Sequence, residues 1–278
     1  MNSLPVVVVG FFLGMLHATD ADHVIAVSTI VSRQGNLKSA ASIGVMWGVG
    51  HTVTVFLVGG AIILFSLVIP PRLGLAMEFT VALMLIALGV FTLRGVSRWV
   101  RENMFPAPDG RFPGHEHAAS RPGAHLHPHV HGDYVHVHVH GHGTQDHGHR
   151  ESATPQAWLD RHLSGLGAYR ALRPLAIGVV HGMAGSAAIA LLILAQIREP
   201  LWGLAYLLLF GVGTIAGMML ITTAIALPFA YSLQRLPNLN LWMRLAAGLL
   251  SLGLGLYLAY QIGVVQGLFT GNPSWSPS

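Results

Sequence analysis

The sequence has no cysteine and few charged residues, and both absences limit what the protein can be. Of its 278 residues, 9% are charged and 53% are hydrophobic. A soluble domain usually carries about 25% charged residues, so a soluble globular fold is excluded. The lack of cysteine excludes disulfides and thiolate metal sites, and it leaves the redox compartment undetermined. The mean hydropathy of +0.58 indicates an integral membrane protein.

Three sequence signals are missing as well. No Lys or Arg precedes the first apolar run and no small-residue cleavage site ends it, so residues 4–31 are predicted to be a retained helix and not a signal peptide. There is no glycine-rich phosphate-binding loop with a lysine, which excludes an ATP-driven pump within this chain. The zinc-protease string HExxH is also absent.

Six apolar segments are long enough to cross a bilayer, which takes about 20 helical residues. Short stretches with Pro, Gly and Asn separate neighbouring segments, as expected of helix breakers. The sequence therefore predicts an all-α polytopic membrane protein. Its six transmembrane helices are predicted at residues 4–31, 40–69, 75–97, 174–197, 201–228 and 243–268.

The basic residues are distributed unevenly among the connections between these spans. Thirteen of the 15 Lys and Arg residues follow the first, third or fifth span. The positive-inside rule then predicts a cytoplasmic (inner) membrane protein with these connections in the cytoplasm and both termini outside. The high isoelectric point, near 9.9, is thus explained by the basic connections on the cytoplasmic side of the membrane. Because no groove-reading motif is present, we expect contact with membrane lipid and no nucleic-acid partner.

The two halves of the chain resemble each other. GMLHATDADHVIA in the first span aligns with GVVHGMAGSAAIA in the fourth, so that His17 matches His181. WGVGHTVTVFLVGGAI in the second span aligns with FGVGTIAGMMLITTAI in the fifth. With three spans per half, the second half enters the membrane from the opposite face, as in transporters whose substrate site lies near the midplane. The predicted domains are a first three-helix repeat at 1–97, a cytoplasmic histidine-rich loop at 98–173 and a second three-helix repeat at 174–278.

The segment HATDADH places four ionisable side chains inside the first apolar span. An aspartate at the centre of a bilayer costs about 2.5–3.5 kcal/mol on insertion scales, so such groups indicate a functional site. In a regular helix, steps of about 100° put His17, Asp20 and His23 on one face. Asp22 would point away from that face, so either the helix is distorted or Asp22 meets a different neighbour. At about 1.5 Å per residue, His51 of the second span lies at a similar depth.

Imidazole and carboxylate together form a ligand set for divalent nickel, cobalt, zinc or iron. A carboxylate can instead orient a histidine that itself binds the metal. Met15 and Met183 flank motif histidines at helical spacing and are interpreted as packing residues, and His162 is interpreted as a surface residue. The candidate metal residues along the ion path are His17, Asp20, Asp22, His23, His51 and His181.

The first motif, His17 followed by four residues and then Asp22-His23, resembles the signature of the nickel/cobalt transporter family. WGVGHTVTVF in the second span is similar to that family's second motif. VVHGMAGSAA in the fourth span is similar to a segment of its short, six-span, urease-associated nickel permease branch. The resemblance implies that His17, Asp22 and His23 recognise the metal and that His51 contributes to its path. Larger relatives have eight spans and an N-terminus inside, so the first span here would match their second.

The predicted loop contains a histidine-rich tract at residues 115–149, which holds 12 of the 17 histidines. Its Pro and Gly content argues against a packed fold, and although YVHVHVHGH alternates as a strand would, we expect disorder. Such tracts bind divalent metals with little geometric selectivity, so the loop is predicted to buffer metal. Its candidate ligands are His115, His117, His125, His127, His129, His131, His136, His138, His140, His142, His147 and His149.

Two functions of different classes fit these residues. The first is a secondary permease for Ni²⁺ or Co²⁺, with uptake favoured by the family resemblance; the protein would then be no enzyme. It would need no resident cofactor, because the metal ion is its substrate, and a cytoplasmic metallochaperone is a candidate partner. A membrane metal sensor would need a signalling domain, which the chain lacks. The alternative is an intramembrane zinc-dependent hydrolase using His17, Asp22, His23, His181 and Ser186.

Overall fold

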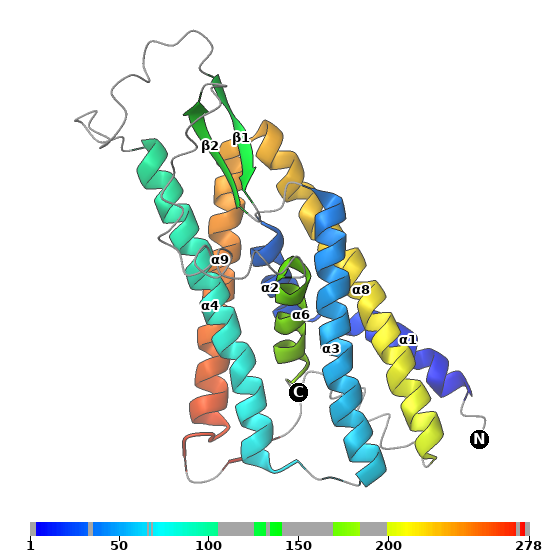
Figure 1. Ribbon diagram of the computed structural model, residues 1–278. Coiled ribbons are helices and arrows are strands. Elements are labelled where there is room, and N and C mark those ends of the chain that lie inside the picture. Colours follow the sequence, from blue (N-terminus) through cyan, green and yellow to red (C-terminus); the bar gives the residue numbers. More distant parts are fainter. Residues whose placement is uncertain are drawn as a thin grey trace. The chain divides into compact units, whose positions relative to one another are not determined.

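The computed structural model describes residues 4–32, 36–65, 67, 69–104, 125–131, 134–140, 169–183, 199–270 and 273–275 (Figure 1). The chain forms two compact units, Met1–Arg94 with Arg170–Ser278, and Gly95–Tyr169. In chain order the described elements are α1 (Leu4–His17), α2 (Ala21–Val31), α3 (Leu37–Phe65), α4 (Pro71–Met104), β1 (His125–His131), β2 (Tyr134–His140), α6 (Tyr169–Gly182), α8 (Pro200–Arg235), α9 (Pro237–Tyr260) and the π-helix η3 (Gln261–Val265).

Four of the described helices are long and apolar enough to cross a membrane. They cover Leu37–Phe65, Pro71–Ser97, Pro200–Ser232 and Asn238–Val265. These ranges coincide with the second, third, fifth and sixth predicted spans. Two shorter apolar helices, α1 and α2, lie within the first predicted span. The chain is a helical, multi-pass membrane protein.

The first predicted span is interrupted, so residues 4–31 do not form the single continuous helix that was expected. α1 ends at His17 and α2 begins at Ala21. Between them Asp20 has φ −58° and ψ 146°, an extended conformation through which helical hydrogen bonding cannot continue. Of the two alternatives left open for Asp22, the distorted helix is the one found. Backbone freed in this way inside a membrane is tolerated where it is packed against protein or lines a cavity.

The fourth predicted span begins earlier than expected. α6 starts at Tyr169 and ends at Gly182, and the remainder of the span after Met183 lies outside the described residues.

At the C-terminal end of the chain, the segment after η3 folds back onto α4. There the indole N–H of Trp275 donates a hydrogen bond to the Glu78 carboxylate (2.9 Å).

The long helix α8 is the central packing element of the helical unit, because it contacts α1, α2, α3 and α9. Fully buried side chains at these contacts include Trp47 of α3 and Tyr206, Leu207 and Met218 of α8. The interrupted pair α1 and α2 is therefore held against one continuous helix. This packing buries His17, Ala18 and His23 on either side of the break between α1 and α2, whereas the side chain of Asp20 within the break is 42% exposed.

Close helix contacts recur at positions that the alignment of the two halves makes equivalent. Gly14 of α1 lies against the main chain of Phe210 in α8, and Gly178 of α6 lies against the main chain of Trp47 in α3. In the alignment Gly14 matches Gly178, and Phe210 matches Trp47. Small residues of this kind allow helix backbones to approach closely in membranes. Gly213 lies against Phe11 and Gly50 lies against Leu175 in the same way; Gly213 matches Gly50, and Phe11 matches Leu175 when the first alignment is continued by three residues.

Gly14→Val is expected to destabilise the helical unit, because a Cβ at this position would overlap the main chain of Phe210. Overpacking a well-packed core costs about 1–3 kcal/mol, and main-chain atoms cannot rotate away as a side chain can. Thermal unfolding of the purified protein in detergent measures the effect. Gly253→Val is the matched control, since nothing lies within 4 Å of a Cβ added there. Equal unfolding temperatures for the two variants would contradict the close contact.

The smaller unit contains an antiparallel hairpin of β1 and β2. We expect disorder in this tract, whereas the structure describes two strands here, each of which pairs with the other. In their register histidine is opposite histidine three times, at His125↔His140, His127↔His138 and His129↔His136. The remaining candidate ligands of the loop outside the strands, His115, His117, His142, His147 and His149, lie outside the described residues.

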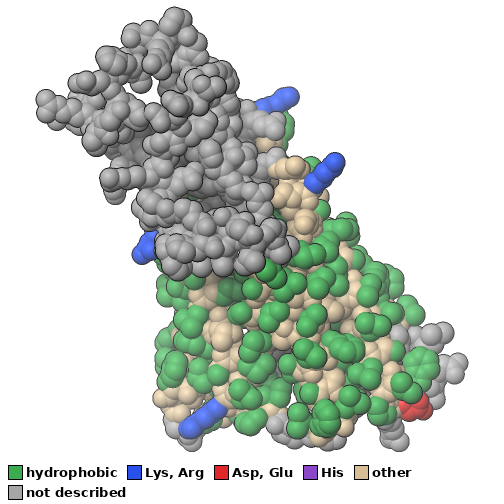
Figure 2. Space-filling view, viewed as in Figure 1, with side chains coloured by type: hydrophobic (Ala, Val, Ile, Leu, Met, Phe, Trp, Pro, Cys, Tyr) green, Lys and Arg blue, Asp and Glu red, His purple; other side chains and the backbone are tan. Residues whose placement is uncertain are grey.

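Hydrophobic side chains cover the face of the described helices that Figure 2 presents. Phe12, Leu57 and Trp242 are each more than 60% exposed, as expected of side chains that face lipid. Lys38 and Arg235 lie at one end of the unit, where α3 begins and α8 ends (Figure 1).

Candidate metal site

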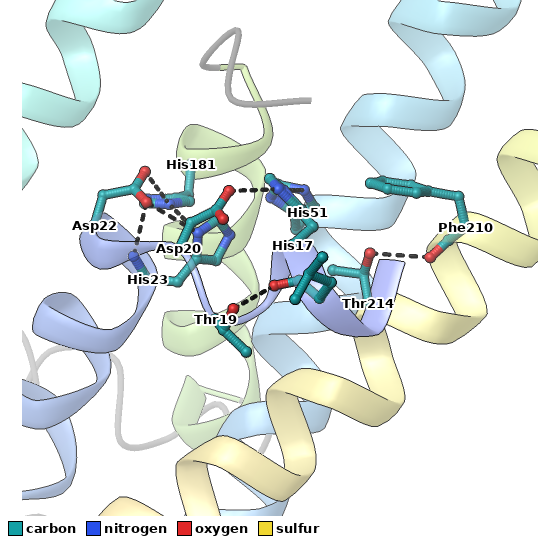
Figure 3. A network of polar contacts seen from close by, with 10 residues as sticks. His17, Thr19, Asp20, Asp22, His23, His51, His181, Phe210 and Thr214 are labelled. Carbon is teal, nitrogen blue, oxygen red and sulfur yellow. Dashed lines mark hydrogen bonds and ion pairs between the residues drawn. The ribbon is translucent and has the colours of Figure 1, made fainter. Parts of the chain in front are cut away.

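Four histidines and two aspartates from separate helices meet around the break between α1 and α2 (Figure 3). His17 is the last residue of α1, and Asp22 and His23 belong to the first turn of α2. His51 lies in the middle of α3, and His181 lies in the last turn of α6. The six residues predicted from the sequence for the ion path thus lie close together, although the chain separates the first and the last by more than 160 positions.

One group of possible ligands consists of three imidazoles. The Nε2 atoms of His17 and His51 are 3.1 Å apart, and the ring centroids of His17 and His23 are 4.7 Å apart. The ligand nitrogens of these three residues all lie within 4.8 Å of one another. Asp20 is outside this group, but its Oδ2 lies 2.8 Å from Nδ1 of His17. Asp20 therefore orients His17 so that Nε2 faces the other rings, the role in which a carboxylate fixes a histidine tautomer.

The second group consists of Asp22, His23 and His181. Nε2 of His181 is 3.1 Å from Oδ2 of Asp22 and 3.3 Å from Nδ1 of His23. Oδ1 of Asp22 is 3.2 Å from the same His23 nitrogen and accepts the backbone N–H of His23 at 3.0 Å. The break before α2 is what allows this arrangement, because a regular helix would have turned Asp22 away from the cluster.

The cluster is buried and incompletely hydrogen-bonded. His23 and His181 are 0% exposed, and His51 is 1% exposed. Within the described residues, Nε2 of His23 and Nδ1 of both His51 and His181 have no hydrogen-bond partner. Leaving a buried polar atom unpaired costs about 1–3 kcal/mol, so nitrogens kept in this state point to a ligand. Neutral imidazole nitrogens with a carboxylate are suited to a divalent transition-metal ion.

Two aromatic residues enclose the cluster. The Trp47 ring is 6.3 Å from the His23 ring and 5.5 Å from the His181 ring, measured between centroids, and the Phe210 ring is 5.5 Å from His17. In the sequence alignment of the two halves, Trp47 matches Phe210. The sequence reasoning did not assign either to the site. The available signal was the position of Trp47, one helical turn before His51 in WGVGH.

Not every residue considered at the sequence level can be placed. Ser186, the candidate nucleophile of a hydrolase, lies outside the described residues. Thr214 of α8, which is equivalent to His51 in the alignment, is fully buried. Its hydroxyl donates to the carbonyl of Phe210 at 2.9 Å within its own helix. Among the described residues, the candidate ligands are three histidines and Asp22 from the first half and His181 from the second.

Comparison with known proteins gives a full-length relative. The chain is 32% identical over 269 residues to the urease accessory protein UreH of Bacillus sp. (strain TB-90). The aligned region covers 97% of this chain and 96% of that protein. No family model matches the chain, and no solved structure matches it. An identity of this level over nearly the whole of both chains establishes common descent and a shared fold, and the chain therefore belongs to the family of the urease accessory protein UreH.

Proposed function

We propose that the protein is a secondary transporter that moves Ni²⁺ or Co²⁺ across the cytoplasmic membrane, in the direction of uptake. The observation that carries the proposal is the buried cluster of His17, Asp22, His23, His51 and His181 at the break of a membrane helix. Ionisable residues inside a membrane are costly and are typical of ion pathways. The name of the relative, a urease accessory protein, and the resemblance of the motifs to nickel permeases agree with this substrate.

The ligand chemistry favours a transition metal as the cargo. Imidazole suits nickel, zinc, copper and iron, whereas magnesium, calcium and manganese prefer oxygen ligands. The cluster offers four histidines and one carboxylate, in two groups of three whose ligand atoms lie within 4.8 Å of one another, and no thiolate. Nickel or cobalt binding through nitrogen with an oxygen contribution is the result expected from this set.

The transport mechanism we propose is alternating access between two inverted three-helix repeats. The matched contacts Gly14–Phe210 and Gly178–Trp47 support it, because each half uses its equivalent residues to contact the other. The interrupted helix also supports it, since such helices form the midplane site of many inverted-repeat transporters. Relative movement of the two halves would then open the cluster to each side of the membrane in turn.

We further propose the predicted topology, with both termini outside and the histidine-rich loop in the cytoplasm. The bias of Lys and Arg toward the connections after spans one, three and five supports it. With the loop at the cytoplasmic face, imported metal would reach the loop directly, and a cytoplasmic metallochaperone could then collect it.

The direct test of the function is ⁶³Ni accumulation in cells that express the chain, compared with cells that carry the empty vector. We expect accumulation that saturates with external Ni²⁺. The same chain purified and reconstituted into proteoliposomes should transport Ni²⁺ without ATP, because the sequence contains no nucleotide-binding loop. Accumulation equal to that of the empty vector, with the protein present in the membrane, would contradict the proposal.

For the loop we propose metal buffering, with the hairpin as an ordered part of it. Residues directly opposite each other in an antiparallel pair have Cβ atoms about 4.5–5.5 Å apart. We propose that histidines at such opposed positions share one ion. The register provides three such pairs, His125↔His140, His127↔His138 and His129↔His136.

Metal stoichiometry is expected to follow intact pairs and not the number of histidines. The double variant His125→Asn with His140→Asn removes one pair, whereas His125→Asn with His136→Asn disrupts two pairs while removing the same number of histidines. The second variant should lose about twice as many bound Ni²⁺ ions as the first. Mass spectrometry of metal content in the purified full chain measures this difference. Equal losses would show that the histidines bind as an unstructured tract.

A further inference from the structure

The two groups of ligands share a single residue, His23. Resting on the proposed function, we propose that the ion occupies two positions in turn and that His23 passes it between them. Position A lies between His17, His23 and His51, and position B lies between Asp22, His23 and His181.

The two nitrogens of the His23 ring differ in their contacts. Its Nδ1 lies 3.2 Å from Oδ1 of Asp22 and 3.3 Å from Nε2 of His181, so position B uses Nδ1. Nε2, the other ring nitrogen, is buried and has no hydrogen-bond partner among the described residues. It is the nitrogen left for position A. His23 thus lies between two adjacent ion positions and offers one ring nitrogen to each.

The chemistry of imidazole makes the two positions mutually exclusive. A neutral ring has one nitrogen with a free lone pair, and the other nitrogen carries the proton. With the ion on Nε2, the proton is on Nδ1, where it can be donated to Asp22. With the ion on Nδ1, the proton is on Nε2. The ring keeps one proton in both cases, so the change of side releases a proton from one ring nitrogen and takes up a proton at the other. Simultaneous occupation would require loss of that last ring proton.

The two positions differ in which parts of the chain build them. His17, His23 and His51 come from α1, α2 and α3, all within the first half. Position B needs His181 of α6, in the second half. Movement of one half against the other therefore completes or breaks position B while position A keeps its ligands. His181 is the residue that couples ion transfer to that movement.

The test is a double-mutant cycle read by ⁶³Ni binding to the purified full chain and by ⁶³Ni uptake in cells. The variants are His51→Gln, His181→Gln, their combination, and His23→Gln. His162→Gln is the control, because it removes a histidine of the loop. All chains share the remaining loop ligands, so the contribution of the loop cancels in differences between them.

Each of His51→Gln and His181→Gln should retain the same amount of tightly bound Ni²⁺ as the full chain, because the other position remains. Uptake should fall at least about 10–100-fold in both. His23→Gln and the double variant should each lose one bound ion, so the effect of the pair on binding far exceeds the sum of the single effects.

Three results would overturn the inference. Additive losses of binding would show one undivided site, loss of two ions in His23→Gln would show simultaneous occupation, and normal uptake in His181→Gln would remove the need for position B. In each of these cases the full chain still accumulates Ni²⁺. Failure of the proposed function is distinguishable, because the full chain itself would then show no accumulation.

Discussion

Alanine at His17, Asp22 or His23 is expected to abolish Ni²⁺ accumulation without preventing insertion of the protein into the membrane. His17 supplies a nitrogen to the three-imidazole group, Asp22 supplies the carboxylate, and His23 belongs to both groups. Loss of residues that merely orient metal ligands already costs about 10–100-fold, and loss of a ligand should cost at least as much. His51→Ala should impair accumulation as well. The measurement is ⁶³Ni content of cells at equal amounts of membrane-inserted protein.

Insertion should survive these changes because each replaces a costly polar group by an apolar one. An aspartate within a span disfavours insertion by about 2.5–3.5 kcal/mol, so its removal helps the helix enter the bilayer. His162→Ala is the matched control, since it removes an imidazole from the loop and should leave accumulation unchanged. Near-normal accumulation in the His17 or His23 variant would refute the assignment of the site.

Much of this architecture follows from the sequence for simple physical reasons. The four span-length helices were predicted because uninterrupted apolar runs of about 20 residues have few other stable structures. His17 and His23 were predicted as site residues because their position within an apolar run needs a functional explanation. His181 was found through its alignment with His17, which depends on the repeat and not on local composition.

The break at Asp20 could not be located from residue spacing, because the argument about faces assumed a regular helix. With φ −58° and ψ 146°, Asp20 redirects the chain, and Asp22 then meets His181 instead of pointing away. That contact also depends on where α6 crosses α3, and there Gly50 of α3 lies against the main chain of Leu175 in α6. Trp47 was not predicted as a site residue for the same reason, since its contact with His23 results from the packing of the helices.

The pairing of the two hairpin strands cannot be read from either segment considered alone. A segment such as YVHVHVHGH has the alternation of a strand but no neighbour to pair with, and its surroundings are rich in Pro and Gly. Pairing with His125–His131 supplies that neighbour. Register between two short strands depends on the turn and on the match of side chains across the pair, which single-segment patterns do not contain.

Competition between metals should reveal the nitrogen character of the site. Co²⁺ is expected to inhibit ⁶³Ni uptake strongly when present at about a tenfold excess, whereas Mg²⁺ should not inhibit at about a thousandfold excess, because it is a poor partner for imidazole. Mn²⁺ should fall between them, as the weakest of the transition ions in the order of affinity.

The physical reason lies in the ligands that an incoming ion would exchange for its water. In position A it would gain three imidazole nitrogens and no oxygen of a side chain, and in position B two nitrogens and one carboxylate. Mg²⁺ dehydrates reluctantly and demands six oxygens in near-ideal octahedral geometry, which neither position supplies.

The matched control is the chain in which a Gly/Ser linker replaces residues 115–149, because the loop ligands could otherwise deplete competing metal. The order Co²⁺ above Mn²⁺ above Mg²⁺ should be the same with and without the loop. Equal inhibition by Mg²⁺ and Co²⁺ would mean that the ion meets oxygen ligands along its path, and the imidazoles of His17, His23 and His51 would then not be what selects it.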